Sequence, residues 1–563
     1  MPPSVAPTTG TRGSRDHAPG TSPSATRAPI VIAAITFIAH LAVVAFGPYG
    51  PHRDALLYYA MGEHLRLFAM DFPPFIAIVA RVFATFGNIE LITHIPIAAA
   101  HCALILLAAA FARRSGGGAG VQSAAALCVA TAAVFMRAGS LFQPVVFDQL
   151  WWTAALWLLA LVPGAADARR RWLALGAVLG LGLLTKFTIL VLGAAILVAI
   201  ILTPERRSLR TPWPWLAGVL ALAVGSPSII GQMMLGWPFL TQFQDLASVQ
   251  LVHVAPLGFV VEQFLIVGPV LLLAIPAALM SLRPHSGHTE DGDTHRAGLR
   301  LVVLAALVAF VLMLFARGKP YYIAPIWPAL IGIGFGRIDR WRRHATSEPS
   351  ARRSTQTTSR ETTPRVGSSG SRRTLRTASL VMLWTLVIAW GVIGLPMGLP
   401  FLGPEPMSAY AARLGAGTTT NTGEVISLPQ DYADMLGWED QAAAVEAAWH
   451  SLTPDEQART VILATNYGRA GAIDWFGSDA LPAAIAPVGS YWFWGPGPLP
   501  GEITIVLGDE AAELEGAYFR SATEFTRVRR PWGVTEEQDV PVTIARDPLG
   551  SLQEFWPRFE GMN

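Results

Sequence analysis

Charged residues are scarce in this chain. Asp, Glu, Lys and Arg make up 14% of its 563 residues, whereas hydrophobic residues make up 52%. A soluble globular domain carries about 25% charged residues. The composition therefore excludes a cytosolic enzyme and a disordered chain, and it predicts a membrane protein. The net charge of +2 gives no sign of an anionic partner, and we expect contacts with membrane lipids and none with nucleic acid.

Cysteine and lysine are also nearly absent. The two cysteines, Cys102 and Cys128, lie within apolar stretches, so we predict no structural disulfide. Of the 41 basic residues, only Lys186 and Lys319 are lysines. So strong a preference for arginine is typical of a GC-rich bacterial genome, and it makes the positions of the two lysines informative.

Long apolar runs, by contrast, are abundant. A helix needs about 20 apolar residues to cross a bilayer, and we identify eleven candidate spans. They lie near residues 28–48, 90–112, 119–137, 147–163, 172–186, 187–203, 213–232, 257–282, 299–316, 320–336 and 377–400. The first run lacks a clear cleavage site and is interpreted as an uncleaved helix. The apolar segment Pro73–Phe86 is too short to cross, which indicates a helix at the membrane interface.

Arginine clusters distinguish the two ends of the predicted spans. If the N-terminus is cytoplasmic, the inner loops hold clusters at 113–114, 169–171, 206–210 and 337–376, and the outer loops hold only scattered basic residues. This distribution follows the positive-inside rule. An odd number of spans then places everything after about residue 402 outside the cytoplasm.

The chain divides into a polar tail, a membrane domain and a second domain. Residues 1–28 are rich in Pro, Ser, Thr and Gly and are predicted to be a disordered cytoplasmic tail. Residues 29–402 form the predicted transmembrane domain, and its polar, low-complexity loop 344–376 is predicted to be disordered on the cytoplasmic side. Acidic and polar residues return in 403–563, which we assign to an extracytoplasmic domain.

This last domain alternates two kinds of periodicity. Helical patterns occur at Glu439–Leu452 and Arg469–Phe476, and short apolar runs typical of buried strands occur at Thr460–Ala464 and Ile503–Leu507. The alternation predicts a small α/β domain.

Besides Glu63, for which capping or pairing with an arginine is the favoured interpretation, three carboxylates lie at the predicted outer membrane boundary. Asp54 and Asp71 belong to the first outer loop, and Asp148 begins the fourth span. Carboxylates at this depth are costly unless they face a cavity or a partner, so all three are candidate catalytic residues. Helix capping or pairing with a nearby arginine is the structural alternative.

Basic and aromatic side chains gather at the same boundary. A lysine there can extend to the lipid headgroups or bind a phosphate as a point charge. Tyrosines can form the interfacial aromatic belt or stack on a sugar ring. The candidate residues for a phosphate or sugar are Lys186, Lys319, Arg137, Tyr58, Tyr59, Tyr321 and Tyr322. His52 and His64 near Asp54 are a weak indication of a metal.

Several ordered motifs resemble a known family. In the membrane half they read RDALLYYAMGEHLRLFAMDFPPFIAIVAR, VVFDQLWWT, LGLLTKFTIL, MMLGWPFL and RGKPYYIAPIWPALIGIG. In the second domain they read GWEDQAAAVEAAWHSL, ILATNYGRAGAIDWFG and SYWFWGPGPLPGEITIVLG. Together they resemble the bacterial glycosyltransferase family 39 proteins, which are dolichyl-phosphate-mannose-protein mannosyltransferase-like enzymes of the GT-C superfamily and are related to the aminoarabinose transferase type.

The resemblance implies a fold and a reaction. It implies a polytopic GT-C membrane fold with about eleven transmembrane helices and an extracytoplasmic α/β domain, in the bacterial cytoplasmic membrane. It also implies inverting transfer of one sugar from a polyprenyl phosphate to a hydroxyl of a glycan, lipid or protein. By motif, Asp54 takes the position of the catalytic carboxylate, and Asp71 matches the Asp before the Pro-Pro pair. Asp148 matches the second-loop Asp that helps organise the site, and Lys186 and Lys319 match basic positions that face it.

Two departures from the family pattern concern the site. Ala55 follows Asp54 where the family commonly has Glu, and Gly236 precedes Trp237 where it often has His. The sequence therefore requires no cofactor and leaves a divalent metal undecided.

Two other functions stay open on the sequence alone. A transporter or flippase of lipid-linked sugars would also have many spans and charges, but we see no inverted repeat, and the carboxylates gather at one face. A family member that binds a lipid-linked sugar without turnover is the third interpretation, prompted by Ala55.

Overall fold

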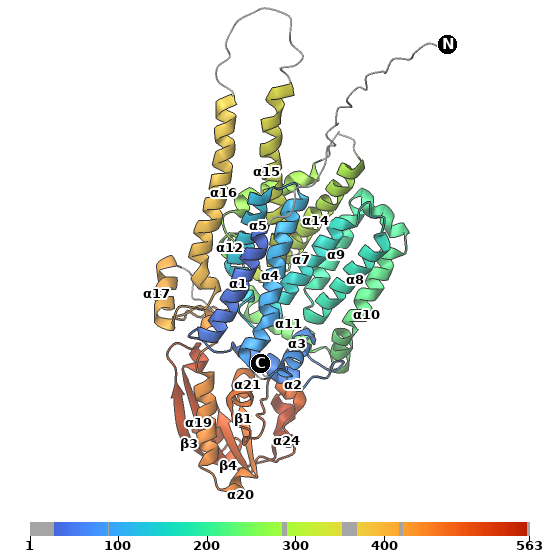
Figure 1. The fold of residues 1–563 in the computed structure, drawn as a ribbon. Coiled ribbons are helices and arrows are strands. Elements are labelled where there is room, and N and C mark those ends of the chain that lie inside the picture. The colour runs from blue at the N-terminus through green and yellow to red at the C-terminus, as the bar shows by residue number, and fades with distance from the viewer. Residues whose placement is uncertain (1–26, 88, 284–289, 352–368, 416–419, 560–563) are drawn as a thin grey trace, which may run out of the picture.

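The computed structural model describes residues 27–559 except 88, 284–289, 352–368 and 416–419. A bundle of long helices stands on a C-terminal domain that contains a β-sheet (Figure 1). The tail predicted at 1–28 lies almost entirely outside the described residues.

Each of the eleven predicted spans is helical. The bundle contains α1 (Ala28–Phe46), α4 (Glu90–Arg114), α5 (Ala119–Thr131), α6 (Ala133–Ala138), α7 (Val145–Leu161), α8 (Ala168–Thr185), α9 (Ile189–Ile201), α10 (Trp213–Met234), α12 (Pro256–Ile266), α13 (Leu271–Leu279), α14 (Glu290–Phe315), η4 (Pro320–Ile326), α15 (Trp327–Ala351) and α16 (Ser369–Gly398). Within the described residues, five helices are long and apolar enough to cross a membrane, or up to seven if each of two bent pairs is one span. The other predicted spans are short, interrupted or charged at one end.

Two predicted spans are broken rather than straight. The run predicted at 119–137 divides into α5 and α6 at Ala132, and the run at 257–282 divides into α12 and α13, which meet at a bend of 108°. Hydropathy reports only that a segment is apolar. It does not report whether neighbouring helices satisfy the backbone groups that a break frees.

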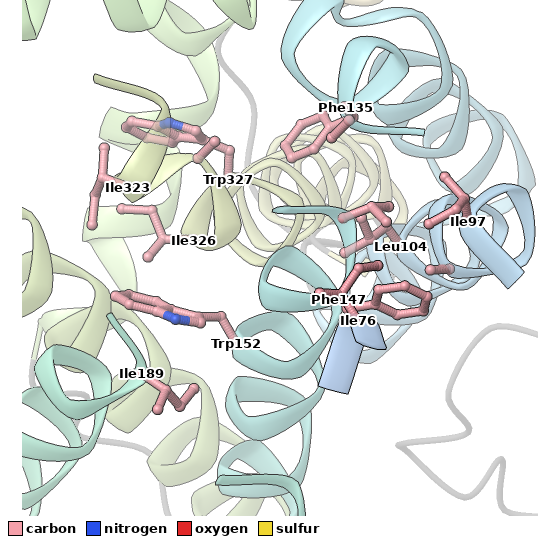
Figure 2. Packing of buried hydrophobic residues seen from close by; sticks show 14 of the residues in the cluster. Ile76, Ile97, Leu104, Phe135, Phe147, Trp152, Ile189, Ile323, Ile326 and Trp327 are labelled. Carbon is pink, nitrogen blue, oxygen red and sulfur yellow. The ribbon is translucent and has the colours of Figure 1, made fainter. Parts of the chain in front are cut away.

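Small residues let the helices approach closely. A Cβ added to Gly176 of α8 would lie 2.3 Å from the carbonyl oxygen of Ala217 in α10, and one on Gly336 of α15 would lie 2.4 Å from that of Ala112 in α4. Such contacts are the main source of helix association in a bilayer. Larger apolar side chains fill the spaces between the helices, and they include Trp152, Ile326 and Trp327 (Figure 2).

Three short helices lie between the long helices of the chain. They are α2 (Arg53–Glu63), α3 (Phe75–Ala84) and α11 (Pro238–Val249), and α3 coincides with the interfacial helix predicted at Pro73–Phe86. In Figure 1, α2 and α3 lie at the lower end of the bundle, where α2 packs against α21 (Tyr467–Phe476) of the C-terminal domain. This junction is where the candidate site is found.

The C-terminal domain, residues 404–559, is a mixed sheet with helices around it. Its elements are α17 (Pro404–Leu414), α18 (Gln430–Ala433), α19 (Trp438–His450), α20 (Pro454–Gln457), β1 (Thr460–Ala464), α21 (Tyr467–Phe476), α22 (Gly489–Trp494), β2 (Ile503–Leu507), α23 (Ala511–Leu514), β3 (Phe519–Arg529), β4 (Asp539–Pro548) and α24 (Leu552–Phe555). The strand order is β1-β2-β4-β3, with β1 parallel to β2 and the other neighbours antiparallel. The predicted ranges of β1 and β2 are confirmed, and every residue of both strands is buried.

The loop predicted to be disordered at 344–376 is partly helical. Helix α15 continues to Ala351 and α16 begins at Ser369, while 352–368 lie outside the described residues. Alanine, arginine and glutamate near these ends are compatible with helix, so a helix can extend past the end of its apolar run.

Candidate functional site

Asp54 is held at the junction by two hydrogen bonds. Its Oδ2 accepts from Nε2 of Gln143 at 3.0 Å, and its Oδ1 accepts from the hydroxyl of Tyr467 at 3.0 Å. Gln143 precedes α7, whereas Tyr467 begins α21 of the C-terminal domain. The Asp54 side chain is still 32% exposed, so the carboxylate is oriented and also reachable.

His52 fixes the start of the helix that carries Asp54. The Nδ1 atom of His52 accepts from the backbone N–H of Asp54 at 3.0 Å, which caps α2. This bond places the ring proton on Nε2, and Nε2 lies 3.8 Å from the carboxylates of Asp431 and Asp434. Burial raises the pKa of Asp434 to about 6, although the nearby His52 and Arg53 oppose the increase.

Tyr58 lies one helical turn after Asp54, on the same side of α2. Burial raises the pKa of Tyr58 well above its ordinary value, and the charges of Asp54 and Asp71 and the phenols of Tyr467 and Tyr322 add to the effect. Tyr58 is therefore a neutral hydroxyl placed among the acidic groups and tyrosines of the junction.

The two lysines lie at the same site. Lys186 follows the last residue of α8, and its Nζ is 4.2 Å from the ring centroid of Tyr322 and 5.2 Å from that of Tyr321. These are cation–π distances. Burial lowers the pKa of Lys319; the neighbouring Lys186 lowers it further, while Tyr322 and Asp54 oppose the decrease. Within the described residues, neither lysine has a carboxylate within 4.0 Å.

Asp148 contacts the short segment between α8 and α9, which contains Lys186. The Asp148 side chain is buried on α7, and its Oδ1 accepts from Oγ1 of Thr188 at 3.0 Å. Thr188 follows Lys186 by two residues, and Asp148 interacts electrostatically with Lys186. Asp148 thus supports the cation.

Three of the predicted site residues make other contacts. Asp71 is buried and accepts from Oγ of Ser490 at 2.9 and 2.8 Å. Arg137 donates to Asp431 at 2.6 Å, and its guanidinium lies 4.2 Å from the ring centroid of Tyr432. These contacts attach the bundle to the C-terminal domain, so Asp71 and Arg137 have structural partners where a catalytic group and a phosphate ligand were expected.

Tyr59 is the third. Its hydroxyl lies 2.9 Å from Oγ1 of Thr93, and its ring stacks on Trp475 with centroids 4.2 Å apart. Neighbouring residues of a helix point about 100° apart. Tyr58 therefore faces Asp54 and Asp71, whereas Tyr59 packs between α2 and α21.

The structure brings together most of the predicted residues and adds others. Asp54, Asp148, Tyr58, Lys186, Lys319, Tyr321 and Tyr322 share one region, as their contacts and mutual charge effects indicate. Sequence reasoning missed Gln143, Tyr467 and Asp431 as site residues. Tyr467 lies within the motif ILATNYGRAGAIDWFG, but the motif does not indicate a contact with Asp54. Their sequence distance from Asp54 gives no signal of contact.

The sequence left a metal undecided. In the part of the chain that the structure describes, no group of three or more His, Cys, Asp or Glu side chains has the arrangement of a metal site.

Comparison with known proteins supports the fold. Residues 71–230 match the family model of dolichyl-phosphate-mannose-protein mannosyltransferases, while no curated protein matches the chain. Among solved structures, ArnT from Cupriavidus metallidurans bound to undecaprenyl phosphate aligns with a TM-score of 0.56 at 16% identity, covering 91% of this chain and 97% of ArnT. Its apo form gives a TM-score of 0.55 with the same identity and coverage.

A weaker match is the archaeal oligosaccharyltransferase AglB from Archaeoglobus fulgidus, with a TM-score of 0.48 at 11% identity, covering 86% of this chain and 70% of AglB. The resemblance seen in the ordered motifs is thus confirmed. The chain has the GT-C fold that it shares with ArnT, and over residues 71–230 it matches the dolichyl-phosphate-mannose-protein mannosyltransferase family.

Proposed function

We propose that the chain is a membrane glycosyltransferase that moves one sugar from a polyprenyl phosphate to an acceptor hydroxyl. The observation that carries this proposal is the pairing of an oriented, partly exposed carboxylate, Asp54, with the two lysines, Lys186 and Lys319, in one region. A base and two cations are what a hydroxyl nucleophile and a phosphate leaving group require.

The proposed reaction is a single displacement with inversion. Asp54 accepts the proton of the acceptor hydroxyl, whose oxygen forms a bond to the anomeric carbon. The bond between that carbon and the phosphate oxygen breaks, and its electron pair leaves with the polyprenyl phosphate. A positioned base of this kind contributes about 10²–10⁴-fold to the rate.

The leaving phosphate needs neutralisation of charge more than a proton. Lys186 and Lys319 supply two cations that have no carboxylate within 4.0 Å among the described residues, and the rings of Tyr321 and Tyr322 hold the ammonium of Lys186 in place. Fixed charges in a partly buried site stabilise a developing anion without reorganising at the moment of reaction. The solved ArnT structure with undecaprenyl phosphate has the same fold, which supports a lipid phosphate as the leaving group.

The positive-inside distribution supports a location in the bacterial cytoplasmic membrane with the site at the outer face. In this orientation the C-terminal domain is extracytoplasmic, and the acceptor is a glycan, lipid or protein of the cell envelope.

The test is turnover of defined donors. Purified full-length protein in detergent is incubated with radiolabelled polyprenyl-phosphate hexoses and pentoses, with a membrane extract as acceptor. We expect one donor to be consumed by the wild-type protein and not by Asp54→Asn. Asp245→Asn, an exposed carboxylate on α11, is the matched control.

Other outcomes separate the rival functions. Full transfer by Asp54→Asn would refute the assignment of the base. Binding of a donor without consumption would favour the non-catalytic interpretation, and movement of labelled lipid between leaflets of vesicles without transfer would favour a flippase.

A further inference from the structure

We propose that Tyr467 of the C-terminal domain is a positioning residue for Asp54, so that this domain completes the catalytic site. The inference rests on the proposed role of Asp54 as base. It is carried by one contact, in which the hydroxyl of Tyr467 donates to Oδ1 of Asp54 at 3.0 Å. The two residues are 413 positions apart, so folding of both domains is required to form the contact.

The start of α21 is anchored by a buried charge network. The side chain of Asn466 caps α21 by accepting from the backbone N–H of Arg469 at 2.9 Å, and its Nδ2 donates to Glu537 at 2.9 Å. Nε of Arg469 donates to the same Glu537 at 3.0 Å, and both side chains of this pair are buried. Tyr467, the first residue of the helix, therefore has a fixed backbone position.

Glycines allow α21 to lie directly against α2. A Cβ on Gly471 would lie 2.9 Å from the Cβ of Leu56, and one on Gly468 would lie 2.7 Å from Cγ of Arg53. Distances under 3.0 Å are not tolerated without movement of one partner. The close approach of the two helices, and with it the reach of Tyr467 to Asp54, thus depends on residues that lack a side chain.

The ring of Tyr467 also has a fixed partner. The guanidinium of Arg53 lies 4.7 Å from the ring centroid, within cation–π distance. Arg53 is itself bonded to Glu536 of the C-terminal domain. This arrangement directs the hydroxyl toward Asp54, the next residue of α2.

The contact has a chemical consequence. Burial raises the pKa of Tyr467 well above its ordinary value, and the nearby Asp54 raises it further while Arg53 opposes the increase. Tyr467 therefore keeps its proton and acts as a donor. The bond fixes the orientation of the carboxylate that accepts it. A carboxylate offers about four lone-pair sites, so Asp54 can still accept the proton of a substrate.

The test measures the reactivity of the Asp54 carboxyl directly. Full-length protein in detergent is labelled with a water-soluble carbodiimide and glycine ethyl ester at one fixed pH, and modification of the Asp54 peptide is followed over time by mass spectrometry. For Tyr467→Phe we expect Asp54 to be labelled several-fold faster than in the wild type, because the hydrogen bond that occupies its Oδ1 is lost.

Tyr491→Phe is the matched control. The Tyr491 hydroxyl also donates to a carboxylate in the same domain, that of Asp474 at 2.6 Å, and its loss is expected to leave the labelling rate of Asp54 unchanged. If Tyr467→Phe fails to fold, 3-fluorotyrosine at position 467 retains the ring and provides a stronger donor, and labelling of Asp54 is then expected to be slower than in the wild type. An unchanged labelling rate in a folded variant overturns the inference.

Labelling does not depend on turnover, so the two proposals fail separately. A changed labelling rate in a protein that transfers no sugar would support the contact and refute the proposed function. In an active protein, Tyr467→Phe is expected to lower kcat and to leave the KM for the donor unchanged, whereas Tyr491→Phe should change neither. Transfer with an unaltered kcat would overturn the role of Tyr467 alone.

Discussion

The guanidinium of Arg137 donates a hydrogen bond to Asp431 at 2.6 Å and thereby joins α6 of the bundle to α18 of the C-terminal domain. Asp431 also lies 3.8 Å from the ring of His52, which caps the helix that carries Asp54. Arg137, which was expected to bind the donor phosphate, thus helps through Asp431 and His52 to position the helix that carries Asp54, the proposed base.

Replacing Arg137 with alanine is expected to destabilise the protein. Asp431 would lose its arginine partner, which costs about 1–3 kcal/mol of the free energy of unfolding. The loss should lie toward the lower end of this range because the Asp431 side chain is 43% exposed. Thermal unfolding followed by tryptophan fluorescence measures the loss. Arg529→Ala, which removes an exposed partner of Asp539 at 3.5 Å, is the control. A rise in the KM for the donor without loss of stability would instead restore Arg137 as a phosphate ligand.

Lys186→Met is expected to reduce transfer strongly. Removing one fixed charge from a developing anion costs about 10²–10³-fold in kcat, and the methionine side chain retains most of the packing against Tyr322. Initial rates with the donor identified in the turnover assay give the change. Arg81→Met, an exposed cation on α3, should retain full activity, and equal losses in both variants would contradict a specific role for Lys186.

Asp71 is expected to make stability depend on pH. Burial raises the pKa of Asp71 from 3.8 to about 6, although the Ser490 hydroxyl opposes this increase. Because its pKa is raised, Asp71 holds its proton more tightly in the folded state than in the unfolded state. The contribution of this proton to the free energy of unfolding is complete below about pH 4 and is lost as the pH rises to about 6. One pKa unit corresponds to about 1.4 kcal/mol, so the whole change is of the order of 3 kcal/mol.

Asp71→Asn should remove this dependence. Melting temperatures between pH 3.5 and 7.5 would then coincide below about pH 4, separate as the pH rises to about 6 and stay apart above it, with the variant more stable. Asp455→Asn, an exposed site, should follow the wild-type curve. Parallel curves for the wild type and Asp71→Asn would show that Asp71 does not take up a proton in this range.

Gly471→Leu is expected to push α21 away from α2. A side chain at this position meets Leu56 at 2.9 Å, and overpacking of this kind costs about 1–3 kcal/mol. Loss of the Tyr467–Asp54 contact should lower activity in protein that remains folded. Gly218→Leu on α10, where no atom lies within 4 Å of the added Cβ, provides the same substitution in open space, and a similar loss there would exclude the proposed cause.

The sequence alone was sufficient where a property is local. Apolar length predicts helices such as α1, and short, fully buried runs predict β1 and β2. Strand β3 was missed because most of its residues are polar or exposed, so no apolar run marks it. Asp54, Lys186 and Lys319 are candidate site residues on the sequence because charge at the edge of an apolar run is itself a signal, and the structure places them in one region.

The tertiary structure decided which of these side chains meet. Tyr58 and Tyr59 are equivalent in the sequence, and only the docking of α2 against α21 directs one to Asp54 and the other to Trp475. Gln143 and Tyr467 reach Asp54 across 89 and 413 residues. Contacts at such separations depend on how whole helices pack, and that packing is determined by glycine positions and buried ion pairs distributed over both domains, which no local pattern records.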